Sequence, residues 1–138
     1  AISSDFIVGF PGETKNDFEQ TIKLVKEVGF AQAYSFKYSK RPGTKSSRMS
    51  SDEIALNEKN ERLIELQELL NKQQSAFNKK FINKNVMVLV KGKGKKLNQY
   101  RGTTKWMQVV NFESKKTMST FESVKIIKSS NNSLLGEI

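Results

Sequence analysis

The sequence predicts two parts of different fold class, an α/β segment over residues 1–80 and an all-β segment over residues 81–138. In the first part, apolar residues recur at helical spacing between two short apolar strands. In the second part they alternate with a period of two, and turn residues separate five short strands. Charge follows the same division. Residues 1–80 carry 13 basic and 11 acidic side chains, whereas residues 81–138 carry 11 basic and 3 acidic ones.

The first part predicts a strand, a helix and a second strand. Ile2–Phe10 is so apolar that we expect a strand buried on both faces, as in parallel sheets covered by helices. Thr14 is expected to cap the helix, with Asp17 in capping-box position, and Gly29 is expected to end it. Residues 33–38 alternate as the second strand. These elements together predict a parallel βαβ unit.

A long helix is expected to follow, from about Asp52 to Lys80. Ser50 and Glu53 form a second capping box at its start. Its apolar side chains recur on one face, which we expect to pack against a core rather than to bind a partner. This stripe consists of Leu63, Leu66, Leu70 and Phe77.

The second part predicts a small barrel. Val86, Val88 and Val90 alternate with Met87 and Leu89, and a basic loop follows at residues 92–96. Closely spaced strands with polar turns predict a five-stranded barrel of the OB type. The expected strands cover residues 86–90, 100–104, 108–112, 123–127 and 133–138.

Composition limits the chemistry of the chain. It contains no Cys and no His, which removes thiolate chemistry, the commonest general base and the commonest metal ligand. We therefore expect no catalytic residue and no metal site here. No stretch approaches the roughly 18 apolar residues that cross a bilayer, so we expect a cytoplasmic protein without a membrane partner. Ala1, followed almost at once by a strand, predicts a piece cut from a longer protein.

The basic surplus of the second part predicts a polyanionic partner. RNA, DNA and an anionic membrane surface all fit the charge alone. Three aromatic residues, Tyr100, Trp106 and Phe112, lie among the basic ones and are of the kind that stacks on unpaired bases, although one or two should belong to the core. We expect RNA to bind here, mainly through its phosphates, with Arg101 contributing most. The predicted RNA-binding residues are Lys91, Lys93, Lys95, Lys96, Arg101, Lys105, Trp106, Asn111 and, in the first part, Arg41.

Three segments of the chain form a recognisable series. They are SDFIVGFPGET at residues 4–14, Tyr38-Ser39 followed by RPGT at 41–44, and a group made of YRGT, VVNF and NSLLGE between residues 100 and 137. In this order they resemble the methylthiotransferase branch of the radical S-adenosylmethionine enzymes, especially the tRNA 2-methylthio-isopentenyladenosine synthases. The last group is similar to the TRAM domain, the RNA-binding module of that family.

The resemblance implies that residues 1–80 are the carboxy-terminal βαβ segment of a radical SAM (TIM-like) barrel plus a linker helix, and residues 81–138 a TRAM domain. It implies a monomeric, cytoplasmic tRNA methylthiotransferase, which adds a methylthio group to isopentenylated adenosine next to the anticodon. Such an enzyme uses S-adenosylmethionine and two 4Fe-4S clusters. On the same basis the cofactor-binding residues would be Ile7, Val8, Gly9 and Pro11.

The chain departs from the family in its lack of Cys. The iron–sulfur clusters of the family are bound by Cys residues, including a CxxxCxxC loop, so we expect this chain to be inactive alone. Two alternatives stay open: a sister methylthiotransferase acting on threonylcarbamoyl-adenosine in tRNA or on a ribosomal protein, and a stand-alone RNA-binding module. Gly9 and Pro11 have an ordinary interpretation too, as the geometry of a strand-to-helix turn.

Overall fold

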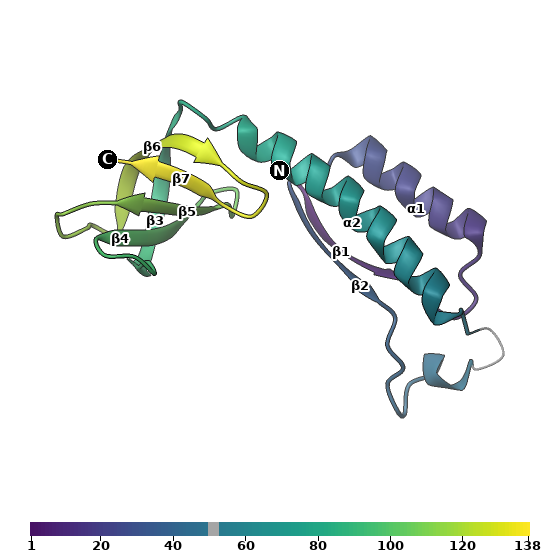
Figure 1. The fold of residues 1–138 in the computed structure, drawn as a ribbon. Helices are drawn as coiled ribbons and strands as arrows, with labels where there is room; N and C mark the ends of the chain where they lie inside the picture. The colour runs from purple at the N-terminus through teal and green to yellow at the C-terminus, as the bar shows by residue number, and fades with distance from the viewer. Residues whose placement is uncertain (50–52) are drawn as a thin grey trace. The chain divides into compact units, whose positions relative to one another are not determined.

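The computed structural model describes residues 1–49 and 53–138 and contains two compact units (Figure 1). We call Ile2–Gln73 the amino-terminal unit and Gln74–Ile138 the barrel unit. Ser50 and Asp52, two residues of the expected start of the long helix, lie outside the described residues.

The amino-terminal unit contains the predicted βαβ arrangement. Strand β1 (Ser3–Val8) and strand β2 (Gln32–Lys37) pair in parallel, with Ser3 opposite Gln32 and Val8 opposite Lys37. Helix α1 (Lys15–Val28) connects them. The connection through a helix is what a parallel pair requires, because the chain must return to the same end of the sheet.

Both ends of α1 have the predicted caps. The Thr14 hydroxyl oxygen accepts the N–H of Asp17 at 3.2 Å, and the Asp17 carboxylate accepts the N–H of Thr14 at 2.9 Å. The hydrogen bonds from the Thr14 side chain and backbone hold the pKa of Asp17 below its ordinary value. At the other end, the N–H of Gly29 donates to the carbonyl oxygen of Val25 at 3.1 Å. The capping box and the C-terminal stop are therefore confirmed.

Helix α2 (Leu56–Lys79) begins later than predicted. Its first hydrogen bond joins the N–H of Lys59 to the carbonyl oxygen of Ala55, at 3.0 Å, and residues 53–55 are not helical. The Glu53 carboxylate lies 3.5 Å from the Lys59 ammonium, whereas the expected capping box also involves Ser50, which lies outside the described residues. The expected start near Asp52 is thus wrong for residues 53–55, because this pairing draws Glu53 to a side chain. A short 3-10 helix, η1 (Ser46–Arg48), precedes α2.

The core of the amino-terminal unit lies on one face of the β1–β2 sheet, where α1 and α2 both pack (Figure 1). The other face carries Ile7, Tyr34 and Phe36, which are 59%, 58% and 54% exposed. Within this chain the expectation of a strand buried on both faces is not met at Ile7, since α1 and α2 both pack on the opposite face. The core residues are Val8, Phe18, Ile22, Val25, Phe30, Leu66 and Leu70.

The outward sides of the helices are charged. On α1, Lys15 pairs with Glu19 at 3.9 Å and Lys23 with Glu27 at 4.0 Å, both at the helical i,i+4 spacing. Such exposed pairs contribute little stability, about 0.3–0.5 kcal/mol each. Across the part of the chain that the structure describes, we find no helix with both the length and the apolarity needed to cross a bilayer.

The barrel unit is a closed five-stranded barrel, as predicted. Its strands follow the order β3-β4-β5-β7-β6, and β3 closes the barrel by pairing with β6. The β5–β7 pair is parallel and the other pairs are antiparallel. Strands β3 and β6 are longer than expected, with nine residues each. The strands are β3 (Asn85–Lys93), β4 (Gln99–Thr104), β5 (Val109–Glu113), β6 (Phe121–Ser129) and β7 (Leu134–Glu137).

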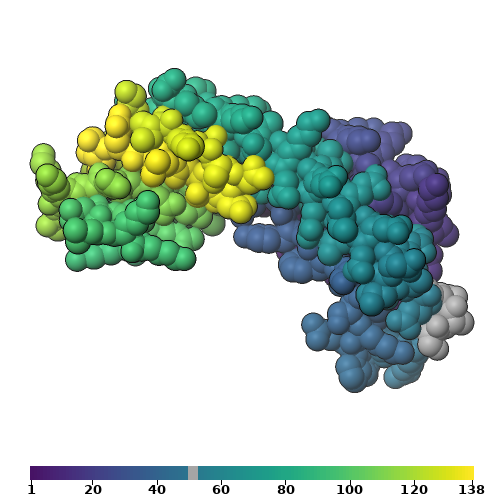
Figure 2. Space-filling model, viewed as in Figure 1, coloured from purple at the N-terminus to yellow at the C-terminus, as the bar shows by residue number. Residues whose placement is uncertain are grey.

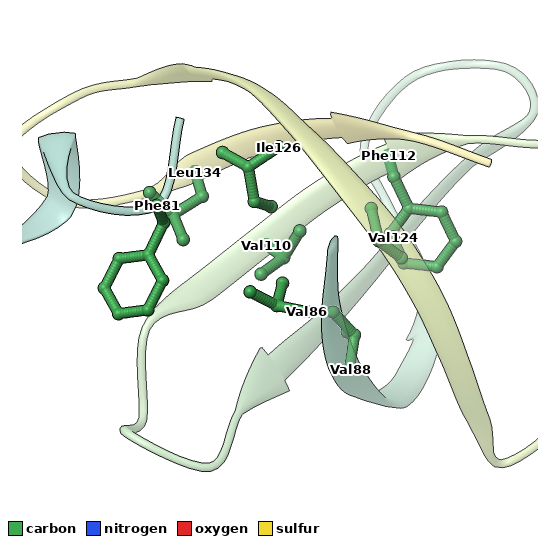
Figure 3. Packing of buried hydrophobic residues seen from close by; sticks show 8 residues of the cluster. All are labelled: Phe81, Val86, Val88, Val110, Phe112, Val124, Ile126 and Leu134. Carbon is green, nitrogen blue, oxygen red and sulfur yellow. The ribbon is translucent and has the colours of Figure 1, made fainter. Parts of the chain in front are cut away.

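The barrel is filled by the inward side chains of its strands, which alternate with outward ones (Figure 3). On β3, Val86 and Val88 point inward, whereas Met87 and Leu89 are exposed. Phe77 of α2 packs against this cluster, so the apolar stripe of α2 serves two cores. Figure 2 shows the same view as a space-filling model, with the strands of the barrel unit in green to yellow. The cluster comprises Phe81, Val86, Val88, Val110, Phe112, Val124, Ile126 and Leu134.

Strands β3 and β4 approach each other closely at Gly102. A Cβ atom at this position would collide with the carbonyl oxygen of Leu89 and the side chain of Val88. Gly102 lies opposite Val90, next to a bulge between Val90 and Gly92. Only a residue without a side chain allows the strands to keep this spacing in the small barrel.

Candidate functional site

Six predicted RNA-binding cations lie on one hairpin of the barrel unit and its continuation. Two are on β3, two in the turn, one on β4 and one just after it, and all are exposed. In the described part of the chain, none has a carboxylate oxygen within 4.0 Å. Their charge is therefore available to an external anion. We call these residues the basic surface: Lys91, Lys93, Lys95, Lys96, Arg101 and Lys105.

The turn of this hairpin is held by Gln99. Its backbone carbonyl oxygen accepts the N–H of Gly94 at 2.6 Å. Its side-chain oxygen accepts the N–H groups of Lys95 and Lys96, at 3.2 and 3.4 Å. These bonds satisfy backbone donors of the turn while both lysine side chains stay exposed. The turn is thus shaped to present two cations to solvent.

Arg101 and Asn111 lie next to each other on the outer surface. They are cross-strand partners on β4 and β5. Their sequence neighbours Gly102 and Phe112 are buried in the barrel, so Arg101 and Asn111 point the other way. The register therefore places together two residues that were predicted separately. Arg41 belongs to the amino-terminal unit, where it is exposed after β2.

The three aromatic residues differ in what they can contact. Phe112 is fully buried, as expected for part of this set, and Tyr100 stacks on it with ring centroids 5.9 Å apart. Trp106 is half-buried; its ring centroid lies 4.9 Å from that of Phe81, and the Lys105 ammonium lies 4.6 Å from it. The rings of Tyr100 and Trp106 are thus already partly covered by the protein's own side chains.

The exposed aromatic residue Phe121 was not among the RNA-binding residues predicted from the sequence. Phe121 is 59% exposed and pairs with Leu89 of β3 on the outer surface. The predicted strand began at Ser123 and so omitted it. Extending the alternation backward from buried Val124 would have placed Phe121 outward, together with Ser123.

The predicted cofactor-binding residues surround the loop after β1, but they do not share one surface. Ile7 is exposed on the open face of the sheet, whereas Val8 is part of the core and Pro11 is buried. Gly9 has φ of 72°, a conformation that favours glycine. The space where its Cβ would point is filled by the side chain of Lys59. In this structure the glycine therefore serves the turn and the close approach of α2.

A charge cluster centred on the buried Arg62 holds the same loop. Arg62 of α2 donates to the carbonyl oxygen of Glu13 at 2.9 Å and also to the carboxylates of Glu13 and Glu58. Glu13 in turn accepts the N–H of Gly9 at 3.0 Å. Burial lowers the pKa of the Arg62 guanidinium, but the hydrogen bonds to Glu13 and Glu58 outweigh it and raise that pKa above its ordinary value.

Sequence reasoning missed this cluster, although a signal was present. Lys59 and Arg62 occur three residues apart and continue, toward the start of α2, the face that carries Leu66. Both are 6% exposed in the structure. Long cations at such positions predict buried partners, because an isolated buried charge is very unfavourable.

No protein-family model matches the chain, but many curated proteins do. A tRNA-2-methylthio-N(6)-dimethylallyladenosine synthase of Wolbachia pipientis (strain wPip) is 50% identical over 97% of the chain. A protein of the same name from Novosphingobium aromaticivorans is 44% identical over the whole chain, and one from Ehrlichia ruminantium (strain Gardel) is 59% identical over 78%. The chain spans 31%, 31% and 24% of the length of these relatives, in their carboxy-terminal part.

The fold defines a class of protein with two parts. One part is a parallel βαβ unit packed against a long helix, and the other is a closed five-stranded barrel with a surplus of basic residues. The relatives define the family within that class. The chain belongs to the family of the tRNA-2-methylthio-N(6)-dimethylallyladenosine synthases. The predicted family is therefore confirmed.

Proposed function

We propose that this chain is the tRNA-holding, carboxy-terminal part of a tRNA methylthiotransferase that adds a methylthio group to isopentenylated adenosine next to the anticodon. The names of the relatives support the reaction and the substrate, and they favour isopentenylated adenosine over the substrates of the sister enzymes. On the resemblance alone, we further propose that the longer protein is a cytoplasmic monomer.

The observation that carries the RNA-binding role is the basic surface. Six exposed cations without a nearby carboxylate, among the described residues, repel one another unless an external anion neutralises them. A nucleic acid backbone supplies phosphates at regular spacing, and its binding releases condensed counterions. The strand order of the barrel and its hairpin of cations support an OB-like TRAM domain.

The amino-terminal unit supports a role as part of a larger α/β barrel. Parallel sheets are usually covered on both faces, yet the face with Ile7, Tyr34 and Phe36 is open in this structure. We propose that the rest of the longer polypeptide covers this face and extends the sheet into a radical SAM barrel. S-adenosylmethionine would then meet Ile7 and the backbone of the β1–α1 loop, because the side chains of Val8 and Lys59 fill the space behind it.

The 4Fe-4S clusters do not fit this chain. It contains no Cys, and the described residues contain no group of three His, Cys, Asp or Glu side chains that could hold a metal ion. Any cluster ligands would come from the rest of the longer protein, so we propose that the chain is inactive by itself.

A binding experiment with the 138-residue chain and unmodified tRNA tests the RNA-holding role. The first variant changes Lys91, Lys93, Lys95, Lys96 and Arg101 to Gln. The control loses the same charge from the amino-terminal unit, through Lys15→Gln, Lys23→Gln, Lys26→Gln, Lys45→Gln and Lys72→Gln. We expect salt-sensitive binding that the first variant weakens at least about tenfold and the control much less. Equal effects of the two variants would contradict a specific role of the basic surface.

A further inference from the structure

A row of exposed apolar side chains crosses the outer surface of the barrel. Leu89 of β3 lies directly opposite Phe121 of β6, and Met87 lies opposite Ser123 in the same pair of strands. Met87 and Phe121 are 60% and 59% exposed, and Leu89 is 37% exposed. Directly opposed residues on one face have Cβ atoms about 5 Å apart, so the Phe121 ring can rest beside Leu89 with one face open. We call Met87, Leu89 and Phe121 the apolar row.

The basic surface borders this row. Lys91 follows two residues after Leu89 along β3, within the bulge between Val90 and Gly92. Thr103 of β4 lies opposite Leu89 on its other side. Arg101 is two residues from Thr103, which corresponds to about 7 Å along a strand. Arg101 therefore lies on the same outer face as Leu89 and Phe121, one strand beyond Leu89, so an exposed cation and an exposed aromatic ring share this face.

An exposed aromatic ring on the same face as exposed cations indicates which kind of ligand binds to this surface. An unpaired nucleotide has a flat apolar base, which stacks on an aromatic ring, and a phosphate, which pairs with a cation beside it. A purely apolar protein surface would gain nothing from Lys91 and Arg101. Tyr100 and Trp106 are less suited, because Phe112, Phe81 and Lys105 already cover parts of their rings.

We propose that Phe121, flanked by Leu89 and Met87, is a stacking platform for an unpaired nucleobase of the bound RNA. The inference rests on the proposed RNA binding by the barrel and adds to it a preference for single-stranded over paired nucleotides. Phosphate contacts alone do not distinguish these, whereas stacking on an open ring needs a base that has left its own stack.

The test uses the 138-residue chain with two probes, an unstructured oligoribonucleotide and an RNA duplex with the same number of phosphates. Phe121→Ala should weaken binding of the single strand at least about fivefold, which corresponds to the loss of one stacked base. It should change duplex binding less than about twofold and leave the salt dependence unchanged. Phe121→Trp should restore single-strand affinity, because indole also offers a flat aromatic face.

Ile127→Ala is the matched control, since Ile127 is on the same strand, apolar and 42% exposed, and lies outside the apolar row. Circular dichroism and melting curves check that each variant folds. If Phe121→Ala and Ile127→Ala bind the single strand equally while binding stays salt-sensitive, the stacking platform is overturned and the basic surface is not. A Phe121→Ala effect on melting without one on affinity identifies a protein contact and also overturns it. Absence of any salt-sensitive binding by the unaltered chain removes the proposed function itself.

Discussion

Arg62 and Glu13 are 49 residues apart in sequence, and the Arg62 guanidinium donates to both the backbone carbonyl and the carboxylate of Glu13. This contact joins α2 to the loop between β1 and α1. Because the Glu13 carboxylate also accepts the N–H of Gly9, this largely buried pair holds both ends of the turn that follows the first strand. The turn's shape therefore depends on a helix that the chain reaches only later.

Replacing Arg62 with Met should destabilise the amino-terminal unit by about 3 kcal/mol, because Glu13 would keep its charge in a partly buried place with one partner fewer. Urea unfolding followed by circular dichroism measures the loss. Lys23→Met is the control, since it removes only an exposed pair with Glu27 and should cost at most about 0.5 kcal/mol. Similar losses for the two variants would show that the buried pair has no special weight.

The capping box at Thr14 predicts a specific titration. Since the pKa of Asp17 is lowered in the folded chain, the carboxylate stabilises the fold above its ordinary pKa of 3.8, and this contribution disappears as pH falls through the lower folded value. Carbon-13 NMR should find the Asp17 midpoint below 3.8, and Thr14→Ala should move it back upward.

Thr14→Ala should also cost about 1 kcal/mol at neutral pH, as N-cap replacements do. Thr21→Ala is a suitable comparison, because Thr21 lies inside α1, where Ala is the better helix former, so its effect should be neutral or stabilising. Thermal melts of both variants measure the two changes in stability, which should have opposite signs or differ by about the cost of the cap. A loss at Thr21 as large as that at Thr14 contradicts the capping role.

Gly102→Ala should destabilise the barrel by about 1–3 kcal/mol, because the added Cβ collides with the Leu89 carbonyl and the Val88 side chain. Gly94→Ala gives the comparison, since its added Cβ meets the side chain of Gln99 in the exposed turn and no backbone of a neighbouring strand. Trp106 is the chain's one tryptophan and lies against Phe81 of the barrel core, so its fluorescence reports unfolding of this unit. Equal midpoints for Gly102→Ala and Gly94→Ala would speak against the close approach of β3 and β4.

Arg101→Gln and Lys128→Gln each remove one positive charge from the barrel unit, but only Arg101 belongs to the basic surface. If tRNA binds there, Arg101→Gln should lower the slope of log affinity against log salt by about one and Lys128→Gln by much less. Filter binding of tRNA at several salt concentrations measures both slopes. Equal changes would mean that net charge, and not position, governs binding.

Local sequence signals predicted the elements whose causes are local. Thr14 with Asp17, and Gly29 after them, act within one helix, so the bounds of α1 followed from the residues alone. The start of α2 did not, because residues 53–55 are not helical and Glu53 pairs with Lys59, six residues further along the chain. The alternation of Val86 and Val88 likewise indicated a half-buried strand, since the period of two is a property of the extended backbone.

The sequence predicted which residue types make up the candidate site, but not how these residues are arranged in space. The basic residues were visible in the sequence, and the resemblance named Ile7, Val8, Gly9 and Pro11. Which aromatic ring is exposed was not visible, because that depends on strand register: Phe112 points into the barrel and Phe121 out of it.

The sequence by itself determined the family, the order of the elements and the concentration of positive charge in the second part. Each of these depends only on residues that are close together in the chain or on the amino-acid composition. Only the tertiary structure decided that Arg62 reaches Glu13, that Arg101 stands beside Asn111, and that Leu89 faces Phe121. The reason is physical: contacts between segments far apart in the chain are fixed by how helices share a core and how strands close a barrel.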